Sequence, residues 1–424
     1  MRLLAPALLP LLLSAARADV VVTLLGDEAP LRGISLGADQ NGVSIHSADG
    51  QVSRVAAGRV IEVATVPPPA APSGGAWPFE IELTDGSRLR GSIENGPDEG
   101  TLRVRSAMLR GTDGYVDLLI EQVRAVRRVT GADVPGTSRL VRIADRDAAY
   151  RLSGARIEGF VARFLATHVE VEREGSARRE IPYGDLAALF VDNPEVPRPE
   201  ELYVVARLAD GSALVLRQDF RVAAGVLSGT LPSGPLLRVS VAHLVALSFQ
   251  GKSFVYLSDL PPLSIRREPF FPLPEGPASA ALLDFVCPVR FDRSPDDRPI
   301  TVEGRRYFKG IGARPRTELR YDVQGKYARF EAECGIDDEV LGPGYGRGAG
   351  EGSVVFTVIG DERKLLETPP VHGGKPARKI RVDITGVRTL TLVVGLVPPE
   401  QMPKGEADSP ELDNAVWARP LLIR

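Results

Sequence analysis

Apolar and polar residues alternate with a period of two along much of the chain, most clearly at residues 79–83. Phe79, Ile81 and Leu83 are separated by single glutamates, a pattern typical of a strand with one face on a core. Asp85-Gly86 follows directly and predicts a hairpin turn, because glycine accepts positive φ without steric cost. The pattern therefore predicts short strands joined by tight turns.

The order of strand, tight turn and further strands recurs along the first 251 residues. Another clear copy runs from Leu202 to Phe249, with Asp210-Gly211 in the turn. Four units of about 45–60 residues follow, each the size of a small SH3-like or Sm-like barrel. We expect these barrel-like units at residues 19–66, 77–131, 138–192 and 200–251. A barrel this short is only marginally stable alone, so neighbouring units should pack on one another.

Composition agrees with many short strands. The chain has 43 glycines and 35 prolines in 424 residues, fewer than in low-complexity chains but enough for frequent turns. Residues 67–76 are rich in proline and glycine and are expected to link the first two units. With 43% hydrophobic residues the chain can bury several cores. We therefore expect an all-β fold.

The N-terminus has the pattern of a signal peptide. An apolar run from Leu3 to Leu13 is followed by Ala16-Arg17-Ala18, which suits signal peptidase and predicts a leader at residues 1–18. The alternative is an uncleaved anchor, but the apolar run falls short of the ~20 residues that a membrane-spanning helix needs. We expect an exported protein, periplasmic or extracellular, with no membrane span after cleavage.

Charge argues against a nucleic-acid partner. The formal net charge is −3, and loss of Arg2 and Arg17 with the leader would make it about −5, whereas nucleic-acid surfaces are strongly basic. Lysine is unevenly distributed, because every lysine lies at or after Lys252. A GC-rich genome would favour arginine throughout, but the change also indicates a domain boundary near residue 252.

Patterns typical of catalysis are scarce. The four histidines lie far apart in the sequence with no HExxH spacing, and neither a G-x-S-x-G nor a phosphate-binding G-x-x-x-x-G-K-[ST] motif occurs. Acidic pairs such as Asp296-Asp297 are expected by chance among 55 acidic residues. The glycine-rich run 342–350 reads as a surface loop. We therefore expect a protein that is not an enzyme.

The last third of the chain contains a series of separated motifs. The series begins with the run Lys309-Gly-Ile-Gly-Ala-Arg-Pro-Arg-Thr-Glu-Leu319, taken as a glycine-hinged turn, and a strand at 327–334. An acidic turn at 335–339, a strand at 352–358, His372-Gly-Gly374, a strand pair at 379–394 and Asp413-Asn-Ala-Val-Trp-Ala418 follow in that order. Together they resemble the NPCBM/NEW2 module of glycoside hydrolase family 98-type proteins. The resemblance covers residues 255–424 and implies a galactose-binding-like jelly-roll β-sandwich of the carbohydrate-binding class.

The resemblance implies a set of ligand-binding residues. Trp417 stands at the family's terminal tryptophan, and an aromatic ring can cover the apolar face of a sugar; the alternative is a tryptophan in the core. Asp413 and Asn414 either line the same pocket or cap the last loop. Asp338 belongs to the acidic turn and is a further candidate for the pocket.

Arg314 departs from the family pattern, which has histidine at this position. Histidine both donates and accepts hydrogen bonds, whereas arginine only donates, so the family's ligand mode does not transfer directly. Its guanidinium suits a carboxylate or sulfate on an acidic polysaccharide. The alternative is a salt bridge to a neighbour such as Glu318 or Asp338.

The same region offers a metal candidate and a disulfide candidate. Asp337 and Asp338 supply oxygen ligands of the kind that calcium prefers, although the two residues alone do not make a site and Asp side chains also cap backbone N–H groups in turns. No other cofactor is expected. Cys287 and Cys334 would be able to form a disulfide in an exported protein, or remain buried free thiols.

Two hypotheses for function follow. The first is an exported, non-catalytic protein that binds cell-envelope or environmental polysaccharide through its C-terminal sandwich. The second is an envelope structural protein whose barrels bind a protein partner and whose sandwich has lost affinity for sugar. An exposed aromatic and polar pocket would favour the first, and a filled or flat surface the second.

Overall fold

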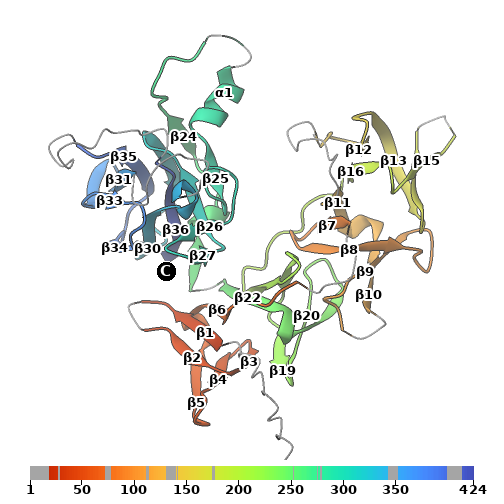
Figure 1. Ribbon diagram of the computed structural model, residues 1–424, viewed down its shortest axis with the longest axis horizontal. Helices are drawn as coiled ribbons and strands as arrows, with labels where there is room; N and C mark the ends of the chain where they lie inside the picture. The colour runs from red at the N-terminus through yellow and green to blue at the C-terminus, as the bar shows by residue number, and fades with distance from the viewer. Residues whose placement is uncertain are drawn as a thin grey trace, which may run out of the picture. The chain divides into compact units, whose positions relative to one another are not determined.

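A computed structural model of the protein describes residues 19–26, 29–71, 78–110, 114–129, 140, 142–173, 177–251, 253–274, 276, 279–341, 352–398 and 413–424. The chain forms two compact units, Met1–Gly251 and Lys252–Arg424 (Figure 1). The predicted leader, much of the predicted linker 67–76 and the glycine-rich run 342–350 lie outside the described residues.

The predicted all-β fold class is confirmed. The described residues contain a single α-helix, α1 (Ser279–Val286), among many short strands. None of the helices in the described ranges has the length and apolar character needed to cross a membrane.

The N-terminal unit is built mainly on one long, strongly branched sheet. Its sixteen described strands are β1 (Asp19–Leu24), β2 (Leu31–Gly33), β6 (Val60–Val66), β7 (Phe79–Leu83), β8 (Arg88–Glu94), β9 (Thr101–Arg105), β10 (Tyr115–Leu119), β11 (Val123–Arg128), β12 (Asp147–Arg151), β13 (Arg156–Phe164), β14 (His168–Glu172), β15 (Arg179–Pro182), β16 (Leu186–Phe190), β17 (Tyr203–Leu208), β18 (Ala213–Leu216) and β22 (Leu244–Gln250). They follow the order β15-β14-β13-β12-β16-β11-β7-β8-β18-β17-β22-β6-β1-β2, with β9 and β10 branching from β8.

This order connects segments that are far apart in the sequence. β6 pairs with β22 through Ala64 opposite Ala246, so the first predicted unit pairs with the fourth and not with the second, its neighbour in the sequence. β11 pairs with β16 and thereby joins the second predicted unit to the third. Most of the buried apolar residues of the unit form one continuous core, and a smaller cluster lies around Tyr150 and Phe190. The division into four separate barrels stays a prediction.

A recurring turn supports the internal repeat. Short 3-10 turns precede the last strand of three predicted units: η1 (Ala57–Arg59) before β6, η3 (Ile120–Gln122) before β11, and η5 (Val241–His243) before β22. At the corresponding point, each of these three strands has a register shift against its neighbour. The same local structure has therefore formed three times from different sequences.

A second sheet of six described strands completes the N-terminal unit. Its strands are β3 (Ser35–Asp39), β4 (Gly42–His46), β5 (Val52–Ala56), β19 (Arg221–Ala223), β20 (Val226–Thr230) and β21 (Leu236–Ser240). The order is β21-β20-β19-β3-β4-β5. Strands from the start of the unit therefore join strands from near its end, where Val222 pairs with Ala38.

The C-terminal unit is a sandwich of two six-stranded sheets. The first sheet contains β23 (Phe254–Tyr256), β25 (Val289–Phe291), β28 (Gly310–Ala313), β30 (Arg329–Ile336), β34 (Arg378–Asp383) and β36 (Ala415–Ile423). The second contains β24 (Ser264–Arg267), β29 (Thr317–Asp322), β31 (Ser353–Gly360), β32 (Arg363–Glu367), β33 (Val371–His372) and β35 (Thr389–Leu396). A hairpin of β26 (Ile300–Val302) and β27 (Arg305–Tyr307) and the 3-10 turns η6 (Leu257–Asp259) and η7 (Asp338–Leu341) complete the described elements of this unit.

The run from Lys309 to Leu319 was predicted as a glycine-hinged turn, but its glycines lie in strand β28 and only residues 314–316 connect β28 to β29. The prediction is therefore wrong for Gly310 and Gly312. β28 lies between β25 and β36 in the first sheet. A Cβ at Gly310 would lie 2.6 Å from Ile300 Cδ1, and one at Gly312 would lie 2.5 Å from the Arg293 carbonyl oxygen. The glycines are therefore needed because other segments pass directly over the strand.

Lys309 anchors this strand through a buried ion cluster. Its ammonium lies 2.6 Å from Asp259 in η6 and 2.6 Å from Asp292 after β25, and the lysine side chain is only 7% exposed. The backbone N–H of Arg419 donates to the Lys309 carbonyl. One lysine thus ties three segments of the unit together.

Lys309→Met should destabilise the C-terminal unit by about 3 kcal/mol, because it leaves two acidic groups close together without their shared counter-charge. Urea unfolding of the full chain, followed by the fluorescence of the buried Trp417, measures the change. Lys364→Met is the matched control, since Lys364 pairs with Glu367 but is 58% exposed and should cost at most about 1 kcal/mol. Equal effects of the two substitutions would contradict the anchoring role.

Candidate functional site

Trp417 lies in the core of the C-terminal sandwich and has no exposed side-chain surface. Its ring meets Phe356 of the opposite sheet edge-on at 4.8 Å between centroids and Phe330 of its own sheet at 6.1 Å. No face of the indole is therefore open to a sugar. Of the two alternatives that the sequence offers, the structure places Trp417 in the core.

Arg314 follows directly after β28 and organises a polar cluster at one edge of the sandwich. Its guanidinium donates to Asn414 Oδ1 at 3.2 Å, to the Val286 carbonyl at 3.2 Å and to Asp296 Oδ1 at 3.1 Å. The salt bridge with Asp296 takes the place of the expected pairing with Glu318 or Asp338. The arginine side chain is 14% exposed, so it fixes the end of α1 against the sheet.

Asn414 and Glu339 form the buried part of this cluster. Asn414 Nδ2 donates to Glu339 Oε1 at 2.7 Å, and Ser294 Oγ donates to the other carboxylate oxygen at 2.7 Å. Asp413 is likewise buried, with 1% exposure. The structure therefore brings Arg314 and Asn414 into direct contact, but as parts of an internal network.

Asp337 and Asp338 bond to backbone groups of the adjoining β26–β27 hairpin and do not lie in an open turn. Asp337 accepts hydrogen bonds from the backbone N–H of Thr301 at 2.9 Å and of Glu339 at 3.0 Å. Asp338 accepts from the backbone N–H groups of Glu303 and Gly304 at 2.8 and 2.7 Å. These contacts match the capping alternative, and the calcium site stays a prediction.

Burial changes the acidity of this cluster. Loss of hydration raises the pKa of Asp337 to about 7, helped by the neighbouring carboxylates Glu339 and Asp338 and opposed by the two backbone hydrogen bonds. Burial also raises the pKa of Glu339. Burial therefore makes both carboxyl groups weaker acids than they are in water.

Cys287 and Cys334 are buried free thiols and are not bonded to each other, so the disulfide expected as one alternative is absent. Burial raises the pKa of both thiols. Cys334 lies on β30 in the core of the sandwich and Cys287 follows α1. Both cysteines therefore behave as small apolar residues.

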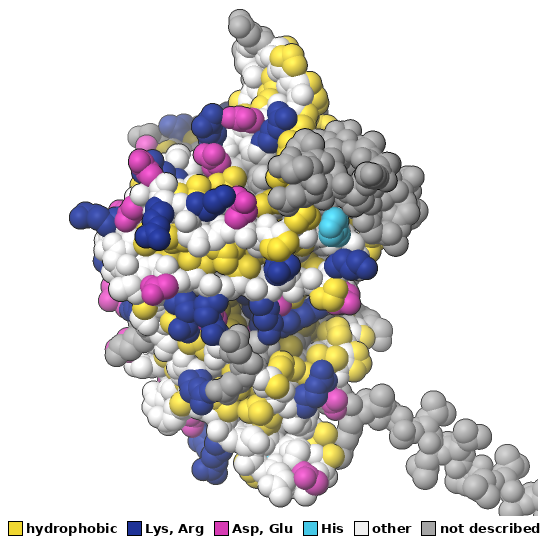
Figure 2. Space-filling view, turned by 90° about the vertical axis from the view of Figure 1, so that its left-hand side faces the viewer, with side chains coloured by type: hydrophobic (Ala, Val, Ile, Leu, Met, Phe, Trp, Pro, Cys, Tyr) yellow, Lys and Arg dark blue, Asp and Glu magenta, His cyan; other side chains and the backbone are white. Residues whose placement is uncertain are grey.

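Exposed aromatic rings are the feature that sequence reasoning missed. Phe285 of α1 is 77% exposed and Phe291 of β25 is 37% exposed. Figure 2 shows hydrophobic side chains at the surface of the projecting part of the molecule, where Figure 1 places α1. In the sequence Phe285 is simply one more apolar residue. Only the structure shows that α1 has no buried residue, so that this ring is exposed.

The N-terminal unit holds a further group of ionisable side chains. His168 and Glu170 of β14 and Glu180 of β15 offer ligand atoms within 4.8 Å of one another, a grouping that the scattered histidines did not indicate. Arg163 already holds Glu170 through two hydrogen bonds of 2.8 and 3.0 Å. The carboxylate is thus neutralised by a guanidinium, which competes with any cation for it.

Comparison with known proteins identifies the C-terminal unit. The model of the NPCBM/NEW2 domain matches residues 255–422, and this part of the chain is an NPCBM/NEW2 domain, as its motifs predict. A protein of Renibacterium salmoninarum, provisionally named endo-alpha-N-acetylgalactosaminidase, is 33% identical over 102 residues, which are 24% of this chain and 6% of that protein. The chain therefore matches only a small part of this curated relative.

Solved structures with similarity to the chain include carbohydrate-binding modules of family CBM51. The CBM51 of Clostridium perfringens GH95, solved with methyl-galactose, is 26% identical, with 40% of this chain and 99% of that chain covered and a TM-score of 0.29. The tandem CBM51 modules of Sp3GH98, a family 98 glycoside hydrolase of Streptococcus pneumoniae, are 13% identical, with 90% and 87% covered and a TM-score of 0.28.

The raised pKa of Asp337 makes the stability of the C-terminal unit depend on pH. Because the folded-state pKa of about 7 lies above the unfolded value of ~3.9, the folded state binds this proton more tightly. The stabilisation is complete below about pH 4 and is lost as pH rises through 7, by at most about 4 kcal/mol. Thermal unfolding of wild type and Asp337→Asn across this range should show the midpoint of wild type falling relative to that of the variant.

A midpoint difference between wild type and Asp337→Asn that stays constant with pH would contradict this assignment. So would a wild-type midpoint that rises relative to that of the variant as the pH increases. Asp383→Asn provides the opposite control. Backbone and side-chain hydrogen bonds from Thr385 lower the pKa of this exposed carboxyl, so its contribution is retained at neutral pH and lost only on acidification.

Proposed function

We propose that the protein is an exported, non-catalytic carbohydrate-binding protein whose C-terminal unit binds a glycan. The match of residues 255–422 to the NPCBM/NEW2 domain carries this proposal. A relative that aligns with the chain over 102 residues at 33% identity is provisionally named endo-alpha-N-acetylgalactosaminidase, and we assign the aligned segment to substrate attachment rather than to catalysis. The apolar run and Ala-x-Ala pattern at residues 1–18 support export.

The glycan is proposed to bind at the edge that carries α1 and β25, not at Trp417. α1 is too short to be stable alone, and it is held from both sides by Arg267, which pairs with Asp284, and by Arg314, which donates to the Val286 carbonyl. β25 is held by pairing with β28, with Phe291 opposite Ile311. Both exposed rings therefore stand on fixed elements.

We propose that Asp296, which Arg314 links to the end of α1, supplies the polar part of the glycan site. Asp296 is 23% exposed and is oriented by its salt bridge to Arg314. A phenylalanine ring covers the apolar face of a pyranose, and a fixed carboxylate accepts hydrogen bonds from its hydroxyl groups. In this proposal Arg314 positions Asp296 and does not itself hold the ligand, because its donors are used within the protein.

Binding of the full mature chain to a panel of neutral and acidic glycans tests the proposal. Phe285→Ala or Phe291→Ala should weaken the glycan that binds best by about tenfold or more, since a stacking surface is lost. Leu263→Ala is the matched control, because Leu263 is 61% exposed in the same unit but carries no ring. It should leave affinity unchanged.

Failure of every glycan to bind a folded protein would overturn the proposal and favour the envelope interaction protein. Retained binding in both phenylalanine variants would overturn the assigned position. Trp417→Ala is unsuitable as a probe, because removing a buried aromatic side chain costs about 3–5 kcal/mol in stability regardless of ligand.

A further inference from the structure

One face of the six-stranded sheet in the N-terminal unit carries exposed arginines. Ala38, Val43 and Val222 lie in register and are buried. Neighbouring residues on each strand point to the opposite face, where Arg54 of β5 and Arg221 of β19 are exposed. This second face is therefore open to solvent and basic.

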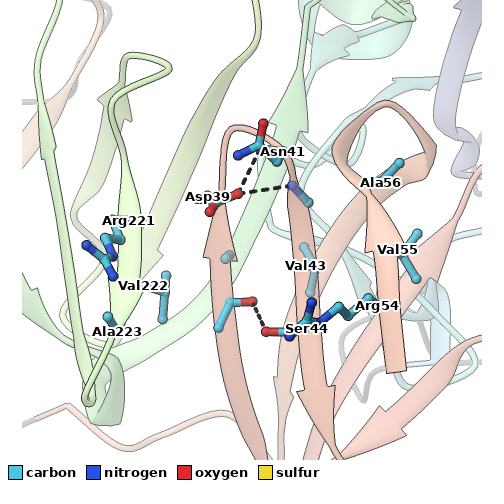
Figure 3. A pocket seen from close by; sticks show the side chains of 13 residues that line it. Asp39, Asn41, Val43, Ser44, Arg54, Val55, Ala56, Arg221, Val222 and Ala223 are labelled. Atoms are coloured by element: carbon cyan, nitrogen blue, oxygen red, sulfur yellow. Dashed lines mark hydrogen bonds between the residues drawn. The ribbon is translucent and has the colours of Figure 1, made fainter. Parts of the chain in front are cut away.

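The exposed face is hollowed into two adjoining depressions. The larger, of about 480 Å³, is lined by β3, β4, β5 and β19, and Figure 3 shows Arg221 and Arg54 on its two sides, with the strands that carry Asp39 and Ser44 between them. The smaller, of about 330 Å³, shares Arg221 and Ala223 with it and adds Arg110 and Arg238. We call this surface, with its four arginines 54, 110, 221 and 238, the arginine groove.

The floor of the groove is made of small residues. Gly37, Gly42 and Ser44 line it on β3 and β4, and Ala223 and Ser228 line it on β19 and β20. A Cβ at Gly42 would overlap the Val55 carbonyl oxygen, so β4 has no room for a larger side chain here. A ligand can therefore approach close to the sheet between the arginines.

None of the four guanidinium groups forms an ion pair with a carboxylate within the described residues. Elsewhere in the unit arginines are paired, as Arg103 is with Asp117 and Arg163 with Glu170. The one carboxylate that lines the groove is Asp39, and its Oδ1 accepts hydrogen bonds from the backbone N–H groups of Asn41 and Gly42. Uncompensated like charges around a hollow favour an anionic ligand.

The lining argues against two classes of anionic ligand. No aromatic ring or large apolar side chain is exposed among the residues that form the two depressions, whereas single-stranded nucleic acids stack bases on aromatic rings and protein partners insert apolar anchors. The net charge of −3 argues against duplex nucleic acid, which binds strongly basic surfaces. Arg221 and Arg238 lie two strands apart, roughly 10 Å, and Arg54 lies three strands from Arg221, roughly 14 Å. Such spacing suits a linear, hydrated polymer with repeated anionic groups.

We propose that the arginine groove is a second binding site, which takes an anionic polysaccharide through the carboxylate or sulfate groups along its chain. The planar guanidinium pairs with such groups through two parallel hydrogen bonds. The hydroxyls of Ser44 and Ser228 lie between the charges and can bond to sugar hydroxyls. The site is separate from the glycan site proposed for the C-terminal unit and does not depend on it.

The test is binding of the full mature chain to polygalacturonate and to heparin, which separate carboxylate from sulfate as the preferred group. Arg221→Ala combined with Arg238→Ala should weaken binding of the preferred polymer about tenfold or more, since two charge-assisted contacts are lost. Raised salt should weaken wild type more steeply than this variant.

Arg173→Ala combined with Arg179→Ala is the matched control. Both residues are exposed, and neither side chain forms a hydrogen bond or ion pair among the described residues. Arg173 follows β14 and Arg179 begins β15, at the other end of the long sheet. The control removes the same net charge and should leave binding within about twofold. Equal weakening of binding in the two double variants would show that net charge alone causes the effect and would overturn the proposal.

Two further outcomes also decide the matter. Binding of polyglutamate as tight as that of either polysaccharide would assign the groove to an acidic peptide instead. Loss of polyanion binding in Phe285→Ala, with full binding in the Arg221 and Arg238 double variant, would place the site in the C-terminal unit and overturn the proposal. Both double variants should retain the wild-type affinity for any neutral glycan held by that unit.

Discussion

The C-terminal sandwich depends on the pairing of its last strand. β36 is buried along its whole length and pairs with β30 on one side, and with β28 and β23 on the other. Nine consecutive buried residues are tolerable only where both strand edges are hydrogen-bonded and both faces are covered. Trp417 supplies much of that cover because it spans the gap to Phe356 in the second sheet.

The polar residues that precede this strand are explained by the same constraint. Asn414 lies where the chain enters the sheet, and its amide bridges Arg314 and Glu339. A buried carboxylate without such donors would cost several kcal/mol. The family motif at 413–418 therefore has largely structural roles here, and for this reason the proposed glycan contacts lie at exposed groups such as Phe285.

Sequence reasoning succeeded where a local pattern decides the structure and failed where distant segments meet. Alternation at Phe79, Ile81 and Leu83 was sufficient for β7, because all three residues are buried on one face. Gly310 and Gly312 suggested a turn, because the sequence around them does not show that Ile300 and Arg293 approach them closely in the fold. The arginine groove likewise required a tertiary contact, because β5 and β19 belong to hairpins from opposite ends of the unit.

Pairing of β6 with β22 also constrains how the N-terminal unit is made. The two strands lie at opposite ends of a segment of the chain that contains most of the other strands of the sheet. Contacts between residues so distant in sequence form slowly, because a long loop must close before they are gained. During synthesis the edge of β6 therefore remains unpaired until β22 emerges, and an unpaired edge is prone to aggregate. A chain that is translocated unfolded and released as a whole would avoid the period in which the edge of β6 is unpaired. A chain that folded during synthesis would need a chaperone to protect this edge.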